Sequence, residues 1–146
     1  MAEVFLSIGS NIDRKKHIRF ALEQLYKAFG PLQTSSVYLS QSIGFDGDDF
    51  YNMVVRVSTS LSVSEIVTLL KSIEKASGRD FTTAKFSART LDIDLLNYDQ
   101  QVTNEPIILP REEILYNAFV LLPFYQLAPQ WYHPIANKTI SELWQA

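Results

Sequence analysis

The sequence contains no cysteine. Without thiols the chain has neither a disulfide framework nor a thiolate metal site, and a small secreted scaffold is disfavoured. No apolar stretch approaches the roughly 20 residues that cross a bilayer. The first apolar stretch, residues 4–8, is also too short for the core of a signal peptide. We therefore expect a cytoplasmic protein with no membrane partner.

An excess of charge is also lacking, since the formal net charge is −3 over 146 residues. A weakly acidic protein does not attract a polyanion over its whole surface, so we expect no nucleic-acid partner, and a phosphate ligand needs a local cluster of Lys and Arg. The composition, with 47% hydrophobic and 20% charged residues, is that of an ordinary globular protein. The length predicts one domain over residues 1–146, and we expect a monomer.

The spacing of apolar residues predicts alternating strands and helices. Strands are expected at residues 4–8, 37–39, 50–58 and 91–98, with the first one ending at a turn over residues 9–11. One helix is expected between Asp13, as its cap, and Gly30, and another between Ser62 or Ser64 and Gly78. Residues 118–127 predict a helix interrupted by Pro123, and residues 139–144 predict a short last helix. This order fits an α+β fold, a ferredoxin-like sandwich in which helices pack on one face of an antiparallel sheet.

Asp92 and Asp94 are two residues apart on a predicted strand, so both carboxylates face the same side. Such an oxygen pair suits Mg²⁺, with the ion shared with ligand phosphates. The preceding loop carries Arg79, Lys85 and Arg89, and carboxylates beside cations are what phosphoryl transfer requires. Asp-x-Asp is a weak motif, however. The alternative is that the aspartates are the exposed face of an edge strand and that the cations belong to a solvated loop.

The segment Lys85-Phe86-Ser87-Ala88-Arg89-Thr90-Leu91-Asp92-Ile93-Asp94-Leu95-Leu96 resembles the signature Arg-Trp-Gly-Pro-Arg-Thr-Leu-Asp-Leu-Asp-Leu-Leu of the hydroxymethyl-dihydropterin pyrophosphokinase family. Other segments match the family in the same order: residues 6–11, 35–38, 50–52, 73–74, 78–79 and 118–123. Several separated motifs in the right order are far more specific than any one of them. The chain is identified as a divergent member of this family.

The resemblance implies an enzyme, an ATP-dependent diphosphotransferase. It would transfer pyrophosphate from MgATP to the hydroxymethyl oxygen of 6-hydroxymethyl-7,8-dihydropterin and release AMP on the route to folate. By the same resemblance, Asp92 and Asp94 hold two Mg²⁺ ions and Arg79 and Arg89 contact the phosphates. Three further residues are assigned to the nucleotide side. They are Glu74, Lys85 and Arg111.

The second substrate implied by the resemblance is a reduced pterin. Asn52 would pair with the donor and acceptor edge of its ring, and Phe50 and Phe119 would stack on its two faces. The backbone of Ser42, Ile43 and Gly44 would line the pocket. For the two phenylalanines, plain core packing is the alternative.

Several nucleotide-side positions depart from the family pattern. Arg111 stands where the family usually has a histidine, and Asn117 stands where it has a later arginine. Phe81 replaces a second loop arginine, and Phe86 replaces the usual tryptophan. Arg111 can still bind phosphate through its planar fork, whereas the lost cations weaken transition-state stabilisation. An impaired paralogue that binds pterin or nucleotide is therefore an alternative, which a turnover assay separates. A ferredoxin-like interaction module is another, and it would not bind magnesium nucleotide.

Overall fold

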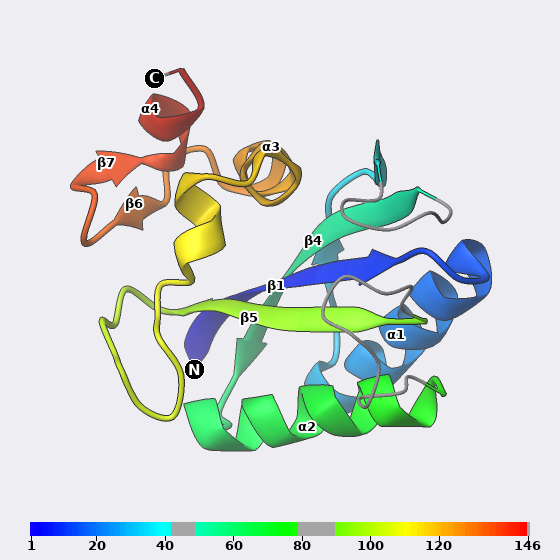
Figure 1. Cartoon of the computed structure of the whole chain (residues 1–146). Helices are drawn as coiled ribbons and strands as arrows, with labels where there is room; N and C mark the ends of the chain where they lie inside the picture. The colour runs from blue at the N-terminus through cyan, green and yellow to red at the C-terminus, as the bar shows by residue number, and fades with distance from the viewer. Residues whose placement is uncertain (42–48, 79–89, 146) are drawn as a thin grey trace.

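The computed structural model describes residues 1–41, 49–78 and 90–145 (Figure 1). The elements are β1 (Ala2–Ser10), α1 (Arg14–Phe29), β2 (Gln33–Thr34), β3 (Tyr38–Ser40), β4 (Phe50–Thr59), α2 (Val63–Ala76), β5 (Asp92–Tyr98), the 3-10 helix η1 (Glu112–Leu115), α3 (Ala118–Leu127), β6 (Tyr132–His133), β7 (Lys138–Thr139) and α4 (Ile140–Gln145). None of the helices in this described part is long and apolar enough to cross a membrane.

The main sheet is antiparallel and follows the order β2-β4-β1-β5, with β3 also paired to β4. β6 and β7 form a separate two-stranded sheet near the C-terminus. β1 lies between the two long strands β4 and β5, and its residues 4–6 are fully buried. A strand that is buried on both faces fits a near-continuous apolar run such as Val4-Phe5-Leu6.

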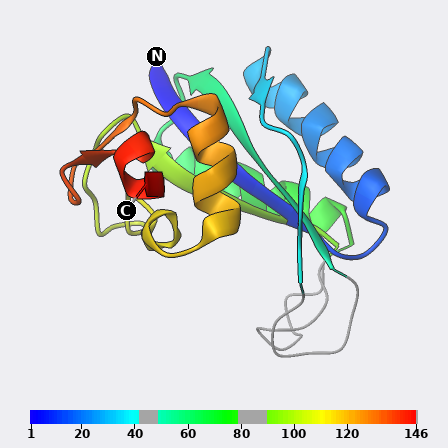
Figure 2. The ribbon, with the colours of Figure 1, turned by 90° about the horizontal axis from the view of Figure 1, so that it is seen from above.

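α1 and α2 cover one face of this sheet (Figure 2). Alternate residues of β1, beginning at Val4 and Leu6, point into this first core and meet Leu25 of α1 and Ile66 and Leu70 of α2. The opposite face carries α3 and the C-terminal segment, and its core contains Phe5, Val54 and Leu96.

The α+β ferredoxin-like class is confirmed, but the helices pack on both faces of the sheet rather than on one. The second face needs a cover because Phe5 is apolar where a one-sided sheet would be polar. The ring of Phe5 stacks on Phe124 of α3 at 4.3 Å, and Phe124 lies 5.2 Å from the ring of Trp131. Aromatic contacts of this kind bury large area in specific geometry.

The expected ends of α2 are confirmed. Ser62 and Glu65 form a reciprocal capping box, with Glu65 N–H donating to Ser62 Oγ and Ser62 N–H donating to Glu65 Oε1. The hydrogen bonds to Ser62 lower the pKa of the exposed Glu65 carboxyl. At the other end Gly78 has φ 92°, a left-handed conformation that glycine adopts without strain.

Three local predictions need correction. Asp13 precedes α1 in a left-handed conformation and makes no side-chain cap hydrogen bond; its backbone oxygen accepts from His17 N instead. β1 does not stop before Gly9 but continues through Ser10. α3 is continuous through Pro123, whose missing N–H would have bonded to the carbonyl of Phe119 in the first turn of the helix, so only one hydrogen bond near the helix start is lost.

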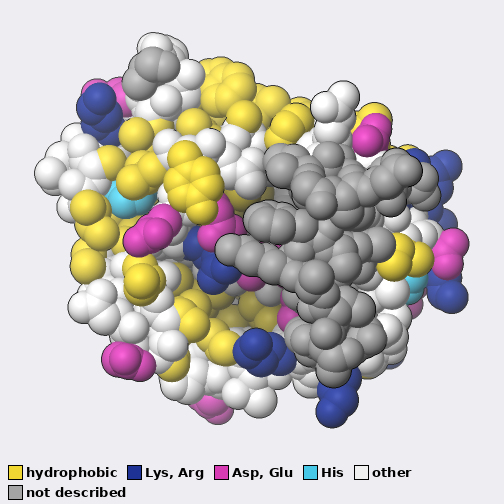
Figure 3. Space-filling view, in the orientation of Figure 1, with side chains coloured by type: hydrophobic (Ala, Val, Ile, Leu, Met, Phe, Trp, Pro, Cys, Tyr) yellow, Lys and Arg dark blue, Asp and Glu magenta, His cyan; other side chains and the backbone are white. Residues whose placement is uncertain are grey.

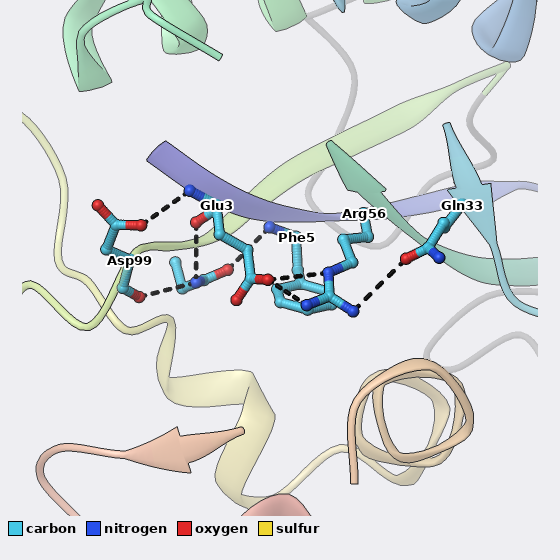
Figure 4. Close-up of polar contacts among 6 residues, drawn as sticks. Glu3, Phe5, Gln33, Arg56 and Asp99 are labelled. Atoms are coloured by element: carbon cyan, nitrogen blue, oxygen red, sulfur yellow. Dashed lines mark hydrogen bonds and ion pairs between the residues drawn. The ribbon is translucent and has the colours of Figure 1, made fainter. Parts of the chain in front are cut away.

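A polar network fastens the end of the sheet that carries the N-terminus (Figure 4). Arg56 pairs with Glu3 and reaches Gln33, and its guanidinium lies 5.3 Å from the ring centroid of Phe5. Glu3 N–H donates to Asp99 Oδ1 at 2.8 Å. These contacts join three strands and the turn after β5. The polar residues at this end of the sheet therefore have a structural role.

Candidate functional site

The central feature of the site is the register of the three longest strands. Gly9 of β1 lies opposite Asn52 of β4 on one side and opposite Asp92 of β5 on the other. In the next row, two residues along the strands, Ser7 is flanked by Val54 and Asp94 in the same way. With strands about 4.8 Å apart, the backbones of Asn52 and Asp92 are about 10 Å apart across Gly9.

Asp92 and Asp94 therefore share a sheet face, as predicted from their spacing. Their side chains are half-buried, whereas Ile93 and Leu95 between and after them point into the first core. The same face carries α3, so the two carboxylates lie beside the second core rather than on a bare edge strand. The pair keeps enough access to receive a ligand.

Arg111 provides a positive charge beside this pair. Its Nη2 lies 3.4 Å from Asp94 Oδ1, and its Nε donates to Glu113 Oε1 at 3.1 Å. Burial alone would lower the pKa of Arg111, but the negative charges of Asp94, Glu113 and Asp92 outweigh burial and raise it. Arg111 N–H also donates to Leu96 O at 2.8 Å, which fixes the residue against β5. On the side of the molecule that Figure 3 shows, acidic and basic side chains gather near the middle, with hydrophobic ones around them.

The donor set fits magnesium. In the ranges 1–41, 49–78 and 90–145 no group of three or more His, Cys, Asp or Glu is arranged to hold a metal. Two carboxylate oxygens on one face suit an ion that takes its other ligands from water and phosphate, which is how Mg²⁺ is usually bound. An adjacent arginine suits the phosphates themselves.

Two of the residues expected to recognise the pterin, Phe50 and Asn52, lie on the same face. Phe50 and Asn52 alternate with the inward-facing Tyr51 and Met53, and Asn52 Nδ2 donates to Ser40 Oγ at 2.7 Å. This hydrogen bond, together with a longer contact to Tyr38 O, fixes the orientation of the Asn52 amide beside β3. Because these contacts use the amide nitrogen, the Oδ1 of Asn52 is the atom positioned to accept a hydrogen bond from a ligand.

Phe119 projects from the first turn of α3, which packs over β4 and β3. Its side chain is 37% exposed, unlike that of Phe124 in the same helix, which is fully buried. Asn117 Oδ1 accepts from Phe119 N–H at 2.9 Å and so caps the helix. Phe119 is therefore not a buried core residue, and its ring is accessible to a ligand. Phe50 is half-buried, which is compatible with either role.

The start of β4 is held from the opposite face of the sheet. Arg14 Nη1 donates to Asp49 O at 2.9 Å, and its guanidinium lies 4.3 Å from the centroid of the Tyr51 ring. A cation over an aromatic face is attracted by the ring electrons. Arg14 thereby contacts the residues on both sides of Phe50, Asp49 through its backbone oxygen and Tyr51 through its ring.

Glu74 is not exposed to the face that carries Asp92. It is buried in the last turn of α2, and its Oε2 accepts from Ile93 N–H at 2.8 Å. The remaining predicted residues lie outside the described part of the chain: Arg79, Lys85, Arg89, Ser42, Ile43 and Gly44.

Two residues of the site were missed at the level of sequence. Gly9 was assigned to a turn, although the alternation that begins at Phe5 and Ser7 continues to Gly9 and would have placed it on the site face. Ser40, the partner of Asn52, lies 12 residues away, and no local pattern pairs them. Ser40 ends a three-residue strand that lies one residue later than the expected residues 37–39.

Fold and site together define an α+β domain with a carboxylate pair and an arginine on one sheet face, a combination suited to a magnesium-bound phosphate ligand. The family model described as 7,8-dihydro-6-hydroxymethylpterin-pyrophosphokinase (HPPK) matches residues 5–129. The chain belongs to this family, which confirms the resemblance drawn from its motifs.

Named relatives agree with this assignment. The chain is similar to the 2-amino-4-hydroxy-6-hydroxymethyldihydropteridine pyrophosphokinase of Aquifex aeolicus, with 33% identity over 97% of this chain and 90% of that protein. It is 31% identical to the protein of the same name from Bacillus subtilis, over 86% of this chain and 78% of that one. It is also 34% identical to the folic acid synthesis protein fol1 of Pneumocystis carinii, of which it spans only 20%.

Solved structures support the fold. Wild-type Plasmodium falciparum HPPK-DHPS with SDX-DHP superposes with a TM-score of 0.76 at 14% identity, and a triple mutant with pteroate superposes with a TM-score of 0.80 at 14% identity. Each match covers 99% of this chain and 43% of the other. The chain thus corresponds to less than half of the length of those proteins.

Proposed function

We propose that the chain transfers pyrophosphate from MgATP to the hydroxymethyl oxygen of 6-hydroxymethyl-7,8-dihydropterin, forming AMP and the pterin diphosphate for folate synthesis. Membership of a pyrophosphokinase family supports the enzyme class that the sequence predicted. The observation that carries the substrate assignment is the row Asn52, Gly9, Asp92, which puts a ring-reading amide and a metal-binding carboxylate on one face.

Asp92 and Asp94 are the residues that would hold magnesium. When bound, Mg²⁺ supplies neutralisation of the phosphate charge that builds up during transfer. Arg111 adds a fixed positive charge at Asp94, already oriented by Glu113 and by the backbone of β5. Two ions, rather than one, are part of the proposal, as are phosphate contacts from Arg79, Lys85 and Arg89.

Asn52 would orient the pterin by hydrogen bonds to its edge, with Phe50 and Phe119 against its faces and the backbone of residues 42–44 lining the pocket. The separation of about 10 Å between Asn52 and Asp92 leaves room for a flat heterocycle whose hydroxymethyl group points toward the carboxylates. In the transfer the hydroxymethyl oxygen bonds to the β-phosphorus and releases its proton to solvent, the bond from this phosphorus to the α-phosphate oxygen breaks, and AMP leaves with that oxygen. Positioning of the two substrates supplies most of the rate in such reactions. We further propose that the protein acts as a monomer.

The direct test is AMP formation from MgATP and 6-hydroxymethyl-7,8-dihydropterin. Asp92→Asn and Asp94→Asn keep the size of each side chain but remove its charge, and each should lower the rate by about 100-fold or more. Glu23→Gln is the matched control, because Glu23 is exposed on α1 across the sheet from the site. Wild-type rates in both aspartate variants would refute the metal assignment.

The number of ions is tested separately. In the presence of a nonhydrolysable ATP analogue, the wild-type protein should bind two magnesium ions per chain. Each aspartate variant should bind one ion, or bind both ions much more weakly. One site in the wild-type protein would reduce the proposal to a single ion.

A second candidate function is pterin or nucleotide binding without transfer. It is favoured by Asn117, which caps α3 with an uncharged side chain where the family resemblance implies an arginine. Nucleotide binding without AMP from a folded wild-type protein would select this candidate, and Asn117→Arg would then be the variant in which to look for restored turnover.

A further inference from the structure

The last turn of α2 is hydrogen-bonded to the backbone of β5 at Ile93, the residue between the two aspartates. Glu74 is 4% exposed, and its carboxylate accepts the N–H of Ile93. β5 stands at the end of the sheet order β2-β4-β1-β5, so this N–H donates to a side chain instead of to a neighbouring strand. A buried carboxylate that accepts a backbone N–H makes a strong, directional hydrogen bond.

Further hydrogen bonds tie the same turn to the start of β5. Ser77 Oγ donates to Glu74 O at 2.6 Å and lies 2.9 Å from Thr90 Oγ1. Ser10 Oγ, at the end of β1, donates to Thr90 O. The backbone from Thr90 to Ile93 is thus held both from α2 and from β1, and Asp92 lies within the held segment.

We propose that Glu74 is a positioning residue for the metal carboxylates. By fixing Ile93, whose side chain is anchored in the first core, it sets the directions in which Asp92 and Asp94 leave the strand on the opposite face. Two carboxylates that must meet one metal and phosphate cluster need their backbones held to a fraction of an ångström. This inference rests on the proposed function for its effect on turnover. The hydrogen bond from Ile93 N–H to Glu74, which we call the Glu74 clamp, can be measured whether or not the protein has that function.

The burial of Glu74 separates this role from direct contact with the nucleotide. A side chain that touches ATP should change KM for ATP at saturating Mg²⁺. A residue that orients the metal ligands should instead raise the Mg²⁺ concentration needed for half-maximal rate and lower kcat, while KM for ATP at saturating Mg²⁺ stays near the wild-type value.

Three variants test the proposal. Glu74→Gln keeps a side-chain oxygen that can accept from Ile93, Glu74→Met keeps the volume without an acceptor, and Lys75→Met controls for methionine at an exposed position of the same turn. The readouts are hydrogen exchange of the Ile93 amide, the Mg²⁺ dependence of AMP formation, and the Mg²⁺ dependence of ATP-analogue binding. We expect about tenfold faster Ile93 exchange and about a tenfold higher Mg²⁺ requirement in Glu74→Met only.

Each outcome decides one point. Unchanged Ile93 exchange in folded Glu74→Met, or an unchanged Mg²⁺ requirement despite faster exchange, overturns the positioning role. If Glu74→Met does not fold, Glu74→Gln decides: wild-type exchange and Mg²⁺ dependence support the role, and a raised Mg²⁺ requirement with a protected amide overturns it in favour of the charge itself. If the wild-type protein forms no AMP, the proposed function fails, and analogue binding together with Ile93 exchange still tests the clamp.

Discussion

Gly9 offers a substitution that should stabilise the protein while impairing it as an enzyme. Glycine weakens a strand, because the unfolded chain loses more freedom when glycine is fixed than when alanine is. Gly9 needs no left-handed backbone, and a Cβ built there would lie 3.6 Å from Asn52 Oδ1 and 3.8 Å from Phe50 Cδ1. These are ordinary contact distances, so the methyl group of alanine fits without any shift.

Gly9→Ala should therefore raise the free energy of unfolding by about 0.5–1 kcal/mol, which corresponds to an increase in Tm of about 1–4 °C for a chain of this size. The added carbon stands between Asn52 and Asp92, where the proposed pterin must pass toward the phosphates. Displacement of a reacting group by about 1 Å can lower a rate about 100-fold. We expect a loss of about tenfold in Gly9→Ala and of about 100-fold in Gly9→Val, mainly in kcat and in pterin affinity.

The assay pairs thermal unfolding with AMP formation and with pterin binding. Ser58→Val is the control, since Ser58 is exposed on β4 at the far end of the sheet, opposite Glu3, and it reports what a β-branched residue does to stability alone. Wild-type turnover in Gly9→Val would show that no substrate occupies the space over Gly9. A fall in both stability and rate in Gly9→Ala would show instead that the strand cannot accept the side chain.

Three further predictions follow from single residues. Ser62→Ala breaks the capping box with Glu65 and should lower the free energy of unfolding by about 1 kcal/mol in denaturant titration, with the rate at 25 °C unchanged. Burial lowers the pKa of His133 below 6.5, so the unfolded chain binds a proton more readily; the free energy of unfolding should fall as the pH drops below 6.5, and less so in His133→Asn, which does not titrate there. Arg111→Gln should lower kcat by about 100-fold, and an unchanged rate would place the phosphates away from Asp94.

Local patterns predicted most of the fold because each of its main elements has its own signal. The β-branched and aromatic run that begins at Phe50 became β4 to within one residue, and the capping box and Gly78 bound α2 as expected. The strands β2, β6 and β7 were not predicted. Each has two residues, too few for any periodicity; β2 forms by pairing with β4, and β6 and β7 form by pairing with each other.

The features of the site also divide into those that a local pattern predicts and those that it does not. The common face of Asp92 and Asp94 follows from the two-residue repeat of a strand, whatever the rest of the chain does. The ion pair of Asp94 with Arg111 and the hydrogen bond of Glu74 to Ile93 join residues 17 and 19 positions apart. Such contacts depend on how η1 and α2 are placed against β5, and a sequence read one segment at a time does not contain that placement.

The pairing of β5, the strand that carries the carboxylates, with β1 contains one irregularity that affects the packing of both cores. In β5 the residues from Asp92 to Leu95 alternate regularly, and continued alternation would put Tyr98 on the face of Asp94. The register instead shifts between Phe5 and Leu6, so that Leu95 pairs with Leu6 and Asn97 with Phe5. The extra residue reverses the alternation that follows.

This bulge lets Leu96 fill the second core while Tyr98 packs against the first, where its hydroxyl donates to Leu61 O at 2.7 Å. Asn97 Oδ1 accepts from Phe5 N–H at 2.8 Å and so pairs the backbone group at the point where the ladder is disrupted. A one-residue slip of β5 would exchange Asp92 and Asp94 with Ile93 and Leu95, which would bury two charges and expose two apolar side chains. The packing of Leu96 and Tyr98 on opposite faces opposes that slip, so the cores at one end of β5 maintain the carboxylate register at the other.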